Sequence, residues 1–183
     1  MGNVIEFRNI TKYFPGVKAL DDISFTANGG EVLALMGENG AGKSTLLKVL
    51  NGDYQQTSGE YLVNGEPCHF NSPREAVAAG IGVIYQERQI MLELTVGENI
   101  FLGRLPTGFM GRIKMREVHS RAQAIIDEFG LDMKSTDKVK DLSVAYQQMV
   151  EIMKAYSREN LKMIAFDEPT ASLSDSEIDS LFR

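Results

Sequence analysis

The sequence has no tryptophan, a single cysteine and only two histidines among its 183 residues. Cys68 alone cannot form a disulfide within the chain, and no Cys-X-X-Cys pair occurs, which favours a reducing compartment. No stretch approaches the roughly 20 apolar residues of a membrane span, and the opening residues MGNVIEFRN carry charge where a secretory signal would be apolar. We therefore expect a protein that reaches a membrane only by docking on another protein.

Long runs of positive charge are also absent. The chain has 25 acidic and 19 basic residues, for a net charge of −6, so nucleic acid is not favoured as a partner. A short basic group is interpreted as a solvated helix face rather than a lipid contact, and it consists of Arg112, Lys114, Arg116 and Arg121. Because 43% of the residues are hydrophobic, the chain can bury a real core.

Apolar periodicity predicts an α/β protein in which a mostly helical insert interrupts a strand-rich core. Strands are expected at 4–8, 22–27, 32–36, 61–63, 82–85 and 163–166, and the first two form an antiparallel pair. Asn64-Gly65, directly after the run 61–63, predicts a hairpin turn. Helices are expected at 46–50, 73–79, 95–102, 118–129 and 145–156. Pro73 opens the second of these helices, Thr95 caps the third, and Gly130 is placed to end the fourth. We assign residues 1–90 and 158–183 to the core of one partial domain and residues 91–157 to its helical subdomain.

A phosphate-binding loop follows the apolar run 32–36. The motif Gly-X-X-X-X-Gly-Lys-Ser/Thr is complete and lies between a predicted strand and a predicted helix, which is the context it requires. Its glycines let backbone N–H groups converge on phosphate oxygens, and the helix N-terminus adds positive potential. We expect Lys43 to reach the β- and γ-phosphates and Ser44 to bind Mg²⁺. The nucleotide-binding residues are Gly37, Glu38, Asn39, Gly40, Ala41, Gly42, Lys43, Ser44 and Thr45.

A pair of carboxylates ends the apolar run 163–166. Asp167 is expected at the carboxyl end of a strand, where ligands bind in open α/β sheets, and it would bind Mg²⁺ directly or through water. Glu168 beside it is placed to orient or polarise an attacking water. A polar turn that merely ends the strand is the alternative, and the phosphate loop upstream disfavours it.

These motifs resemble, in family order, those of the ATP-binding cassette (ABC) ATPases, and the resemblance covers essentially the whole chain. It implies a P-loop NTPase (RecA-like) core, an N-terminal antiparallel β subdomain, a helical insert, and ATP with Mg²⁺ as ligands. GENGAGKST resembles Walker A, and AFDEP resembles Walker B with Glu168 as the catalytic glutamate. Gln86 resembles the Q-loop residue that senses Mg²⁺ and the γ-phosphate. Phe14 resembles the aromatic that stacks on adenine, with Tyr13 as its rival.

The stretch DLSVAYQQ at 141–148 occupies the place of the family signature, LSGGQ. Its serine is expected to cap a helix and to face the γ-phosphate held by a different cassette. The residues assigned to that contact are Ser143, Val144, Ala145, Tyr146 and Gln147. The other face is predicted to be a core stripe of Ala145, Met149, Ile152, Met153 and Tyr156.

Four segments resemble the first cassette of the bacterial monosaccharide importers: SPREAVAAGIGVIYQE, LTVGENIFLGR, LSVAYQQMVEIMKA and DEPTASLSD. The resemblance implies that the protein hydrolyses ATP to power the import of a sugar. It also implies a second cassette bound head to tail, transmembrane permease subunits, a solute-binding protein met only indirectly, and a cytoplasmic place on the inner face of the cell membrane.

The sequence departs from the family pattern in three places. The signature carries Val-Ala-Tyr where relatives have Gly-Gly-Gln, and Asp175 of the D-loop comes one residue late. His69 and His119 both precede Asp167, whereas the switch histidine of the family lies on a later strand. We therefore expect a truncated piece that lacks the last strands of its sheet and is inactive alone.

Three other functions stay open on the residues. A P-loop kinase is disfavoured because Asp167 and Glu168 suit attack by water. An ABC-type ATPase with a mechanical or translation-related role needs no membrane partner. A nucleotide-binding module without catalysis would keep the phosphate loop but show no turnover.

Overall fold

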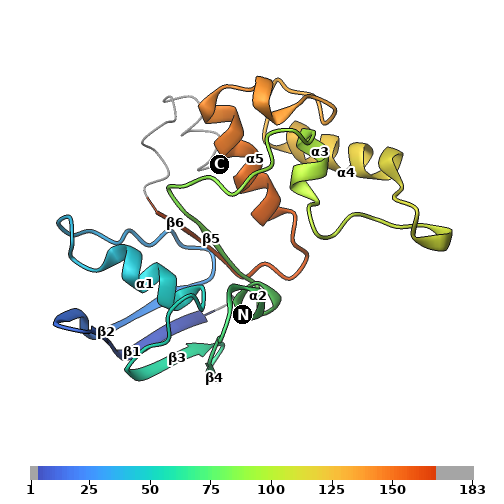
Figure 1. Cartoon of the computed structure of the whole chain (residues 1–183). Coiled ribbons are helices and arrows are strands. Elements are labelled where there is room, and N and C mark those ends of the chain that lie inside the picture. The colour runs from blue at the N-terminus through green and yellow to red at the C-terminus, as the bar shows by residue number, and fades with distance from the viewer. Residues whose placement is uncertain (1–3, 168–183) are drawn as a thin grey trace. The chain divides into compact units, whose positions relative to one another are not determined.

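The computed structural model describes residues 4–167, which divide into two compact units (Figure 1). The first unit holds residues 4–83 together with 160–167, and the second holds residues 84–159. Strands dominate the first unit and helices the second, as expected for an α/β protein with a helical insert. Within residues 4–167, every helix is too short or too polar to span a lipid bilayer.

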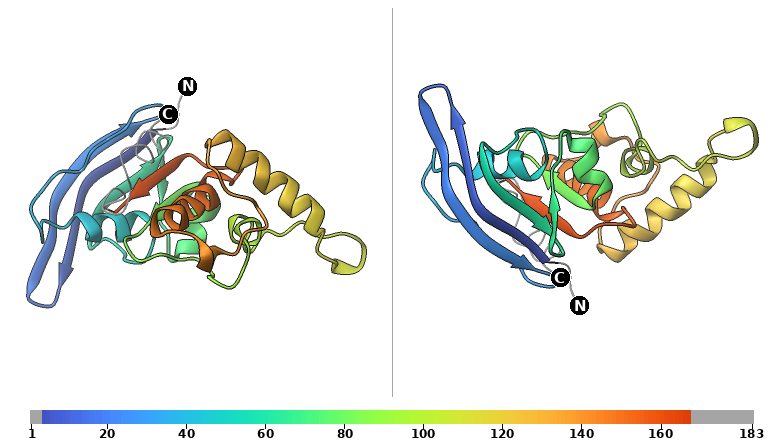
Figure 2. Two further views of the ribbon diagram at one scale, coloured as in Figure 1. Left: turned by 90° about the horizontal axis from the view of Figure 1, so that it is seen from above. Right: turned by 90° about the horizontal axis from the view of Figure 1, so that it is seen from below.

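Antiparallel strands make the main sheet of the first unit. They are β1 (Val4–Phe14), β2 (Val17–Asn28), β3 (Ser58–Val63) and β4 (Glu66–Cys68), in the order β2-β1-β3-β4. The long hairpin of β1 and β2 is seen along its length in Figure 2. The predicted Asn-Gly turn at 64–65 joins β3 to β4, and both of its residues have positive φ (55° and 80°), as a type I′ turn requires.

The core of this unit lies between the sheet and helix α1 (Lys43–Leu50). Phe7 of β1 stacks between Phe25 and Tyr61, with ring centroids 4.5 and 5.0 Å apart. The helix contributes four buried side chains to the same cluster, Leu46, Leu47, Val49 and Leu50. Burial of these side chains fixes α1 beside the sheet, and with it the end of the phosphate loop that leads into the helix.

A second sheet pairs β5 (Ile81–Ile84) with β6 (Met163–Phe166). Gly80, just before β5, has a φ of 95°, and a Cβ atom there would lie 2.2 Å from the carbonyl oxygen of Asn160. Only glycine therefore lets the two segments approach so closely. The carbonyl of Gly80 accepts a hydrogen bond from the Lys162 N–H at 2.8 Å. This contact brings β6 alongside β5 and sets where β6 ends.

The apolar run 32–36, expected as a buried strand, is not a strand in the structure. Residues 31–38 have no regular structure, and Val32 and Met36 are 81% and 92% exposed. An apolar run favours burial, but a strand also needs partners for its backbone N–H and C=O groups. No strand within residues 4–167 pairs with this run. The prediction is wrong here because apolar content alone does not supply a neighbouring strand.

Helices build the second unit. They are α3 (Val96–Ile100), α4 (Met115–Glu128) and α5 (Val144–Tyr156), with short 3₁₀ segments η1 (Phe109–Gly111) and η2 (Val139–Asp141). One buried cluster joins the three α-helices, and it contains Val96, Ile100, Val118, Ala122, Ile126, Val150 and Met153. This spacing of three and four residues is the helical periodicity seen in the sequence.

Sequence signals for the ends of helices are confirmed at three places. The Thr95 hydroxyl accepts from the Glu98 N–H, and the Glu98 carboxylate accepts from the Thr95 N–H at 2.8 Å, which is a capping box before α3. Helix α2 (Pro73–Ala78) begins at its proline. Gly130, with a φ of 65°, follows the end of α4.

Tyr156 is the exception to the predicted core stripe of α5. It is 41% exposed, and its hydroxyl donates to the Glu128 carboxylate at 2.6 Å. The fully buried apolar members of the stripe are Met149, Ile152 and Met153. The helix also buries two polar side chains, Gln147 and Glu151, so its buried surface is wider than one apolar stripe.

Candidate nucleotide-binding site

The phosphate loop passes into α1 through glycines in the left-handed region. Gly40 and Gly42 have φ of 85° and 92°, and Gly42 is the residue before the first turn of the helix. A Cβ atom on Gly42 would lie 2.4 Å from the carbonyl oxygen of Ala19 in β2. Gly42, the second glycine of the Gly-X-X-X-X-Gly-Lys-Ser/Thr pattern, is thus required both by its φ and by the closeness of the sheet.

The ammonium group of Lys43 lies over the loop. It donates hydrogen bonds to the carbonyl oxygens of Gly37 and Glu38, at 2.7 and 3.0 Å. The lysine therefore spans the loop from its last part to its first, which concentrates positive charge where backbone N–H groups can meet an anion. This is the place where the sequence predicted phosphate contacts.

Ser44 and Asp167 come together although 123 residues separate them. The Ser44 hydroxyl donates to the Asp167 carboxylate at 3.3 Å, because α1 begins where β6 ends. A hydroxyl oxygen and a carboxylate oxygen are both donors that Mg²⁺ accepts, and their chemistry fits such an ion together with nucleotide oxygens. Among residues 4–167, no group of three or more His, Cys, Asp or Glu side chains is arranged for a metal ion.

An aromatic and cationic cluster lies at the end of β1. The Phe14 ring meets the Tyr54 ring edge-on at 5.2 Å, and the ammonium group of Lys12 lies 5.0 Å from the Phe14 centroid. The ammonium group of Lys48 lies 5.4 Å from the centroid of the Tyr54 ring. Tyr13, the rival of Phe14, is 50% exposed and lies beneath the ammonium of a different lysine. Sequence reasoning did not single out Tyr54, whose only signal was an aromatic residue shortly after α1.

Gln86 lies two residues beyond β5 and is exposed. Three residues later, α5 holds the backbone of Gln89 at both of its polar groups. The Glu151 carboxylate accepts from the Gln89 N–H at 3.0 Å, and the Lys154 ammonium donates to the Gln89 carbonyl at 2.9 Å. The segment that follows Gln86 is therefore hydrogen-bonded to α5, the helix that begins within the predicted signature. The signal in the sequence was the presence of two charged residues, Glu151 and Lys154, among the apolar positions of α5.

Burial changes the acidity of both side chains of this clamp. Burial raises the pKa of Glu151, because the charged carboxylate loses water, and its Oε2 has no hydrogen-bond partner among residues 4–167. Burial likewise lowers the pKa of Lys154, against the favourable charge of Glu151. The two shifts have opposite signs but one cause, since both charges are withdrawn from solvent.

Ser143 caps α5 as predicted. Its side chain accepts from the Tyr146 N–H at 3.3 Å, and Ser143 and Val144 are both exposed. Gln147 differs from the expectation that it faces a partner's nucleotide. It is 8% exposed, and its amide donates to the carbonyls of Val139 and Leu142 at 3.1 and 3.2 Å. Gln147 thus fastens the approach to α5 because its helical position points it inward.

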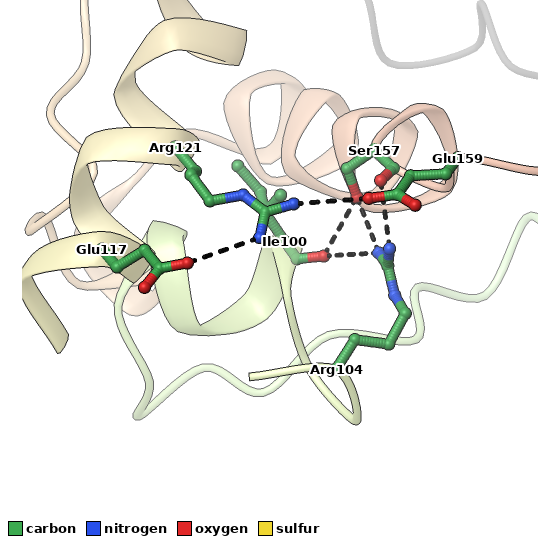
Figure 3. Close-up of polar contacts among 6 residues, drawn as sticks. All are labelled: Ile100, Arg104, Glu117, Arg121, Ser157 and Glu159. Atoms are coloured by element: carbon green, nitrogen blue, oxygen red, sulfur yellow. Dashed lines mark hydrogen bonds and ion pairs between the residues drawn. The ribbon is translucent and has the colours of Figure 1, made fainter. Parts of the chain in front are cut away.

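Arg104 joins the C-terminal ends of two helices in the second unit (Figure 3). Its guanidinium donates to the carbonyl of Ile100 in α3 at 3.2 Å. It also donates to the carbonyl of Lys154 in α5 at 3.3 Å. It also donates to the Ser157 carbonyl at 3.0 Å and to the Ser157 hydroxyl at 2.7 Å. Carbonyl groups at helix ends lack partners within the helix, so the cation satisfies them and complements the helix dipoles.

Glu168, the predicted catalytic glutamate, and the D-loop at 171–175 lie outside the described residues. Of the predicted site, the structure brings together the phosphate loop, Ser44 and Asp167 in the first unit. Gln86 and the signature residues belong to the second unit. The roles of all these residues in nucleotide binding remain predictions.

Comparison with known proteins connects this geometry to a family. A family model described as ABC transporter matches residues 20–171. The chain is 51% identical to an arabinose import ATP-binding protein of Burkholderia ambifaria, over all of this chain and 36% of that protein. It is 52% identical to an arabinose import ATP-binding protein of Vibrio parahaemolyticus, over 98% of this chain and 35% of that one. The chain therefore spans about a third of the length of these relatives.

Solved structures show the same fold. An ATP-binding cassette of an ABC transporter in its ADP conformation aligns with a TM-score of 0.81 at 28% identity, over 100% of this chain and 75% of that one. A dimeric ATP-binding cassette bound to ADP and Pi after hydrolysis aligns with a TM-score of 0.77 at 26% identity, over 97% of this chain and 79% of that one. Because the family model covers well over half of the sequence, the chain belongs to the ABC transporter family, of whose ATPase domain it forms a part.

Proposed function

We propose that the chain is the nucleotide-binding part of an ATPase that powers sugar import through a membrane permease. The observation that carries the proposal is the 3.3 Å contact between Ser44 and Asp167, beside the phosphate loop. It gathers two oxygen donors suited to Mg²⁺ where the loop would hold phosphates. The 51% identity to an arabinose import ATP-binding protein supports sugar import and makes arabinose the first sugar to test.

Each residue of the site would take one part in binding MgATP. Lys43 would exchange its two carbonyl contacts for the β- and γ-phosphates, and the backbone N–H groups of 38–44 would bind phosphate oxygens. Ser44, Asp167 and Gln86 would hold Mg²⁺, which neutralises phosphate charge when bound. Phe14 would stack on adenine, supported by the edge of the Tyr54 ring.

Hydrolysis would need parts that a single copy of this chain does not combine. Glu168 would polarise the attacking water. Ser143, as the exposed cap of α5, would contact the γ-phosphate held by a second cassette placed head to tail. We therefore expect ATP binding by this chain with negligible turnover. A phosphate-release assay that found Glu168-dependent turnover in the isolated chain would contradict this expectation.

Calorimetric titration of the 183-residue chain with MgATP tests the binding site. Lys43→Ala should abolish measurable binding, and Asp167→Asn should remove the dependence of affinity on Mg²⁺. Lys134→Ala is the matched control, because this exposed lysine belongs to the second unit and lies outside the proposed site. Equal affinities for the chain and its Lys43→Ala variant would refute the proposed site.

The partners proposed for the longer protein are a second cassette and transmembrane permease subunits, at the inner face of the cell membrane. A solute-binding protein would take part only through the permease. Affinity purification of the chain from cells that produce a matching permease tests this assembly. Recovery of the chain without any membrane subunit, in the presence and absence of ATP, would favour the ABC-type ATPase with a mechanical or translation-related role.

A further inference from the structure

The loop that leads into α4 ends in an exposed apolar tip. Phe109 and Met110 are 90% and 84% exposed, among the highest values for large apolar side chains in residues 4–167. Figures 1 and 2 show η1 at the outer end of α4, on the side away from α3 and α5. Neither side chain therefore contributes to the core of the second unit.

The backbone of this loop has a defined conformation that leaves the side chains of its tip exposed. Met110 has a φ of 60°, which is unusual for a residue with a Cβ atom and costs roughly 1 kcal/mol. Thr107 and Ile113 bridge the base of the loop, and the Gly108 N–H donates to the Arg112 carbonyl at 2.8 Å. The base of the loop is thus closed by backbone contacts, while Phe109 and Met110 at its tip stay exposed.

The charge around the tip is of one sign. The segment 105–116 contains three basic residues and no acidic one, in a chain whose net charge is −6. Arg112 and Arg116 are exposed, and neither forms an ion pair or a side-chain hydrogen bond with another residue in 4–167. Lys114 is engaged with Glu117 at 3.4 Å. Two arginines close in sequence to the apolar tip are therefore free to meet an external anion.

We propose that this tip, residues 105–116, binds the surface of an anionic lipid bilayer. Phe109 and Met110 enter the boundary between headgroups and acyl chains, and Arg112 and Arg116 pair with lipid phosphate and carboxylate groups. An apolar point flanked by cations is the chemistry that an anionic membrane surface recognises. The contact does not depend on nucleotide, so it stands or falls separately from the proposed ATPase site.

The basic group, which the sequence analysis interpreted as a solvated helix face, lies only partly on a helix in the structure. Arg121 does lie on α4, where it approaches Glu117 and Glu159 at 3.8 and 3.7 Å. Arg112 instead precedes the helix, in the loop that carries the apolar tip. Arg116 also lies on α4, in its first turn, and is exposed without an ion pair within residues 4–167. The basic group is therefore helical at Arg116 and Arg121, whereas Arg112 lies in the loop that carries the apolar tip.

Flotation with lipid vesicles tests the proposal in the whole 183-residue chain without nucleotide. Vesicles of phosphatidylcholine with roughly 30% phosphatidylserine should carry the chain up the gradient, and vesicles of phosphatidylcholine alone should carry much less. Phe109→Ser with Met110→Ser should lower the partition constant on the order of tenfold. Arg112→Gln with Arg116→Gln should lower it about 25-fold, since each cation near the surface contributes about fivefold. The run 32–36 is also apolar and exposed, but it is the same in every variant, so a difference between variants cannot come from it.

The absence of tryptophan gives the test a second readout. Phe109→Trp keeps the apolar tip and adds the chain's single tryptophan, whose emission should shift to shorter wavelength on anionic vesicles and be quenched by brominated lipids. Val17→Trp, at an exposed site of the first unit, is the matched control and should show neither change. The proposal would be overturned if the serine and glutamine variants floated as well as the unchanged chain. It would also be overturned if the unchanged chain bound neutral and anionic vesicles equally, or if the emission of the tip tryptophan did not shift.

Discussion

Arg104→Ala should destabilise the second unit by about 2 kcal/mol. The substitution removes four hydrogen bonds that the guanidinium donates, to the carbonyls of Ile100, Lys154 and Ser157 and to the Ser157 hydroxyl. Hydrogen bonds from a charged donor contribute about 1.5–3 kcal/mol when they are buried. Arg104 is exposed as a residue and water can replace it, so we assign about 0.5 kcal/mol to each.

Arg121, drawn beside Arg104 in Figure 3, is the matched control. It carries the same charge and, like Arg104, lies over the Phe101 ring, at 5.1 Å against 5.8 Å. Its polar contacts, however, are two ion pairs of 3.8 and 3.7 Å between exposed side chains, with Glu117 and Glu159. Such pairs contribute about 0–1 kcal/mol and weaken in salt. Arg121→Ala should therefore cost about 0.5 kcal/mol at low salt and less at high salt, whereas the effect of Arg104→Ala should persist.

Hydrogen exchange is the appropriate assay, because it reports the stability of α3 and α5 directly rather than that of the whole chain. Amides at the C-terminal ends of both helices should exchange about 30-fold faster in Arg104→Ala, which corresponds to about 2 kcal/mol. Arg104→Lys should give an intermediate result, since a lysine keeps the charge but not the planar fork of donors. Equal effects of Arg104→Ala and Arg121→Ala would refute the reasoning, because charge alone would then explain both.

Three further perturbations follow from single contacts. Burial raises the pKa of Glu151 above its ordinary 4.5, so the folded chain keeps a proton that the unfolded chain releases, and the free energy of unfolding should fall as pH rises above that value. Glu151→Gln should flatten this dependence in urea titrations across pH, and an unchanged slope would contradict it. Thr95→Ala removes the capping box with Glu98 and should lower the free energy of unfolding by about 1 kcal/mol in the same assay, and an unchanged value would contradict this. Gly42→Ala should lower stability more than Gly40→Ala, because both glycines have positive φ but only the Gly42 Cβ would meet a backbone oxygen, at 2.4 Å; equal melting temperatures would count against it.

Local signals in the sequence predicted much of the fold. The Asn-Gly turn, the Thr95 cap and Gly130 after α4 each depend on residues within a few positions, and the structure confirms all three. The run 32–36 failed because its burial depends on strands far away in sequence, which a local apolar pattern does not specify. The predicted burial of Tyr156 was wrong for a related reason, because its hydroxyl binds the Glu128 carboxylate, a contact that the local pattern does not specify.

In the candidate site, too, the parts encoded by neighbouring residues could be predicted and the long-range contacts could not. The phosphate loop and its lysine could be predicted because the backbone conformation, the glycines and the helix start are encoded within nine residues, 37–45. The clamp on Gln89 could not, because nothing in the sequence states that Glu151 and Lys154 reach a loop about 60 residues earlier. Long-range polar contacts of this kind depend on how the elements pack.

The meeting of Ser44 and Asp167 depends on a chain of contacts that excludes the exposed run 32–36. Gly80 allows the Asn160 segment to approach within a distance that any Cβ atom would forbid, and the Lys162 N–H then binds the Gly80 carbonyl. These two contacts register β6 on β5 and so fix where Asp167 emerges. Meanwhile the buried leucines of α1 hold Ser44 against the main sheet. The two halves of the proposed metal site are therefore positioned independently of the apolar run that precedes the loop.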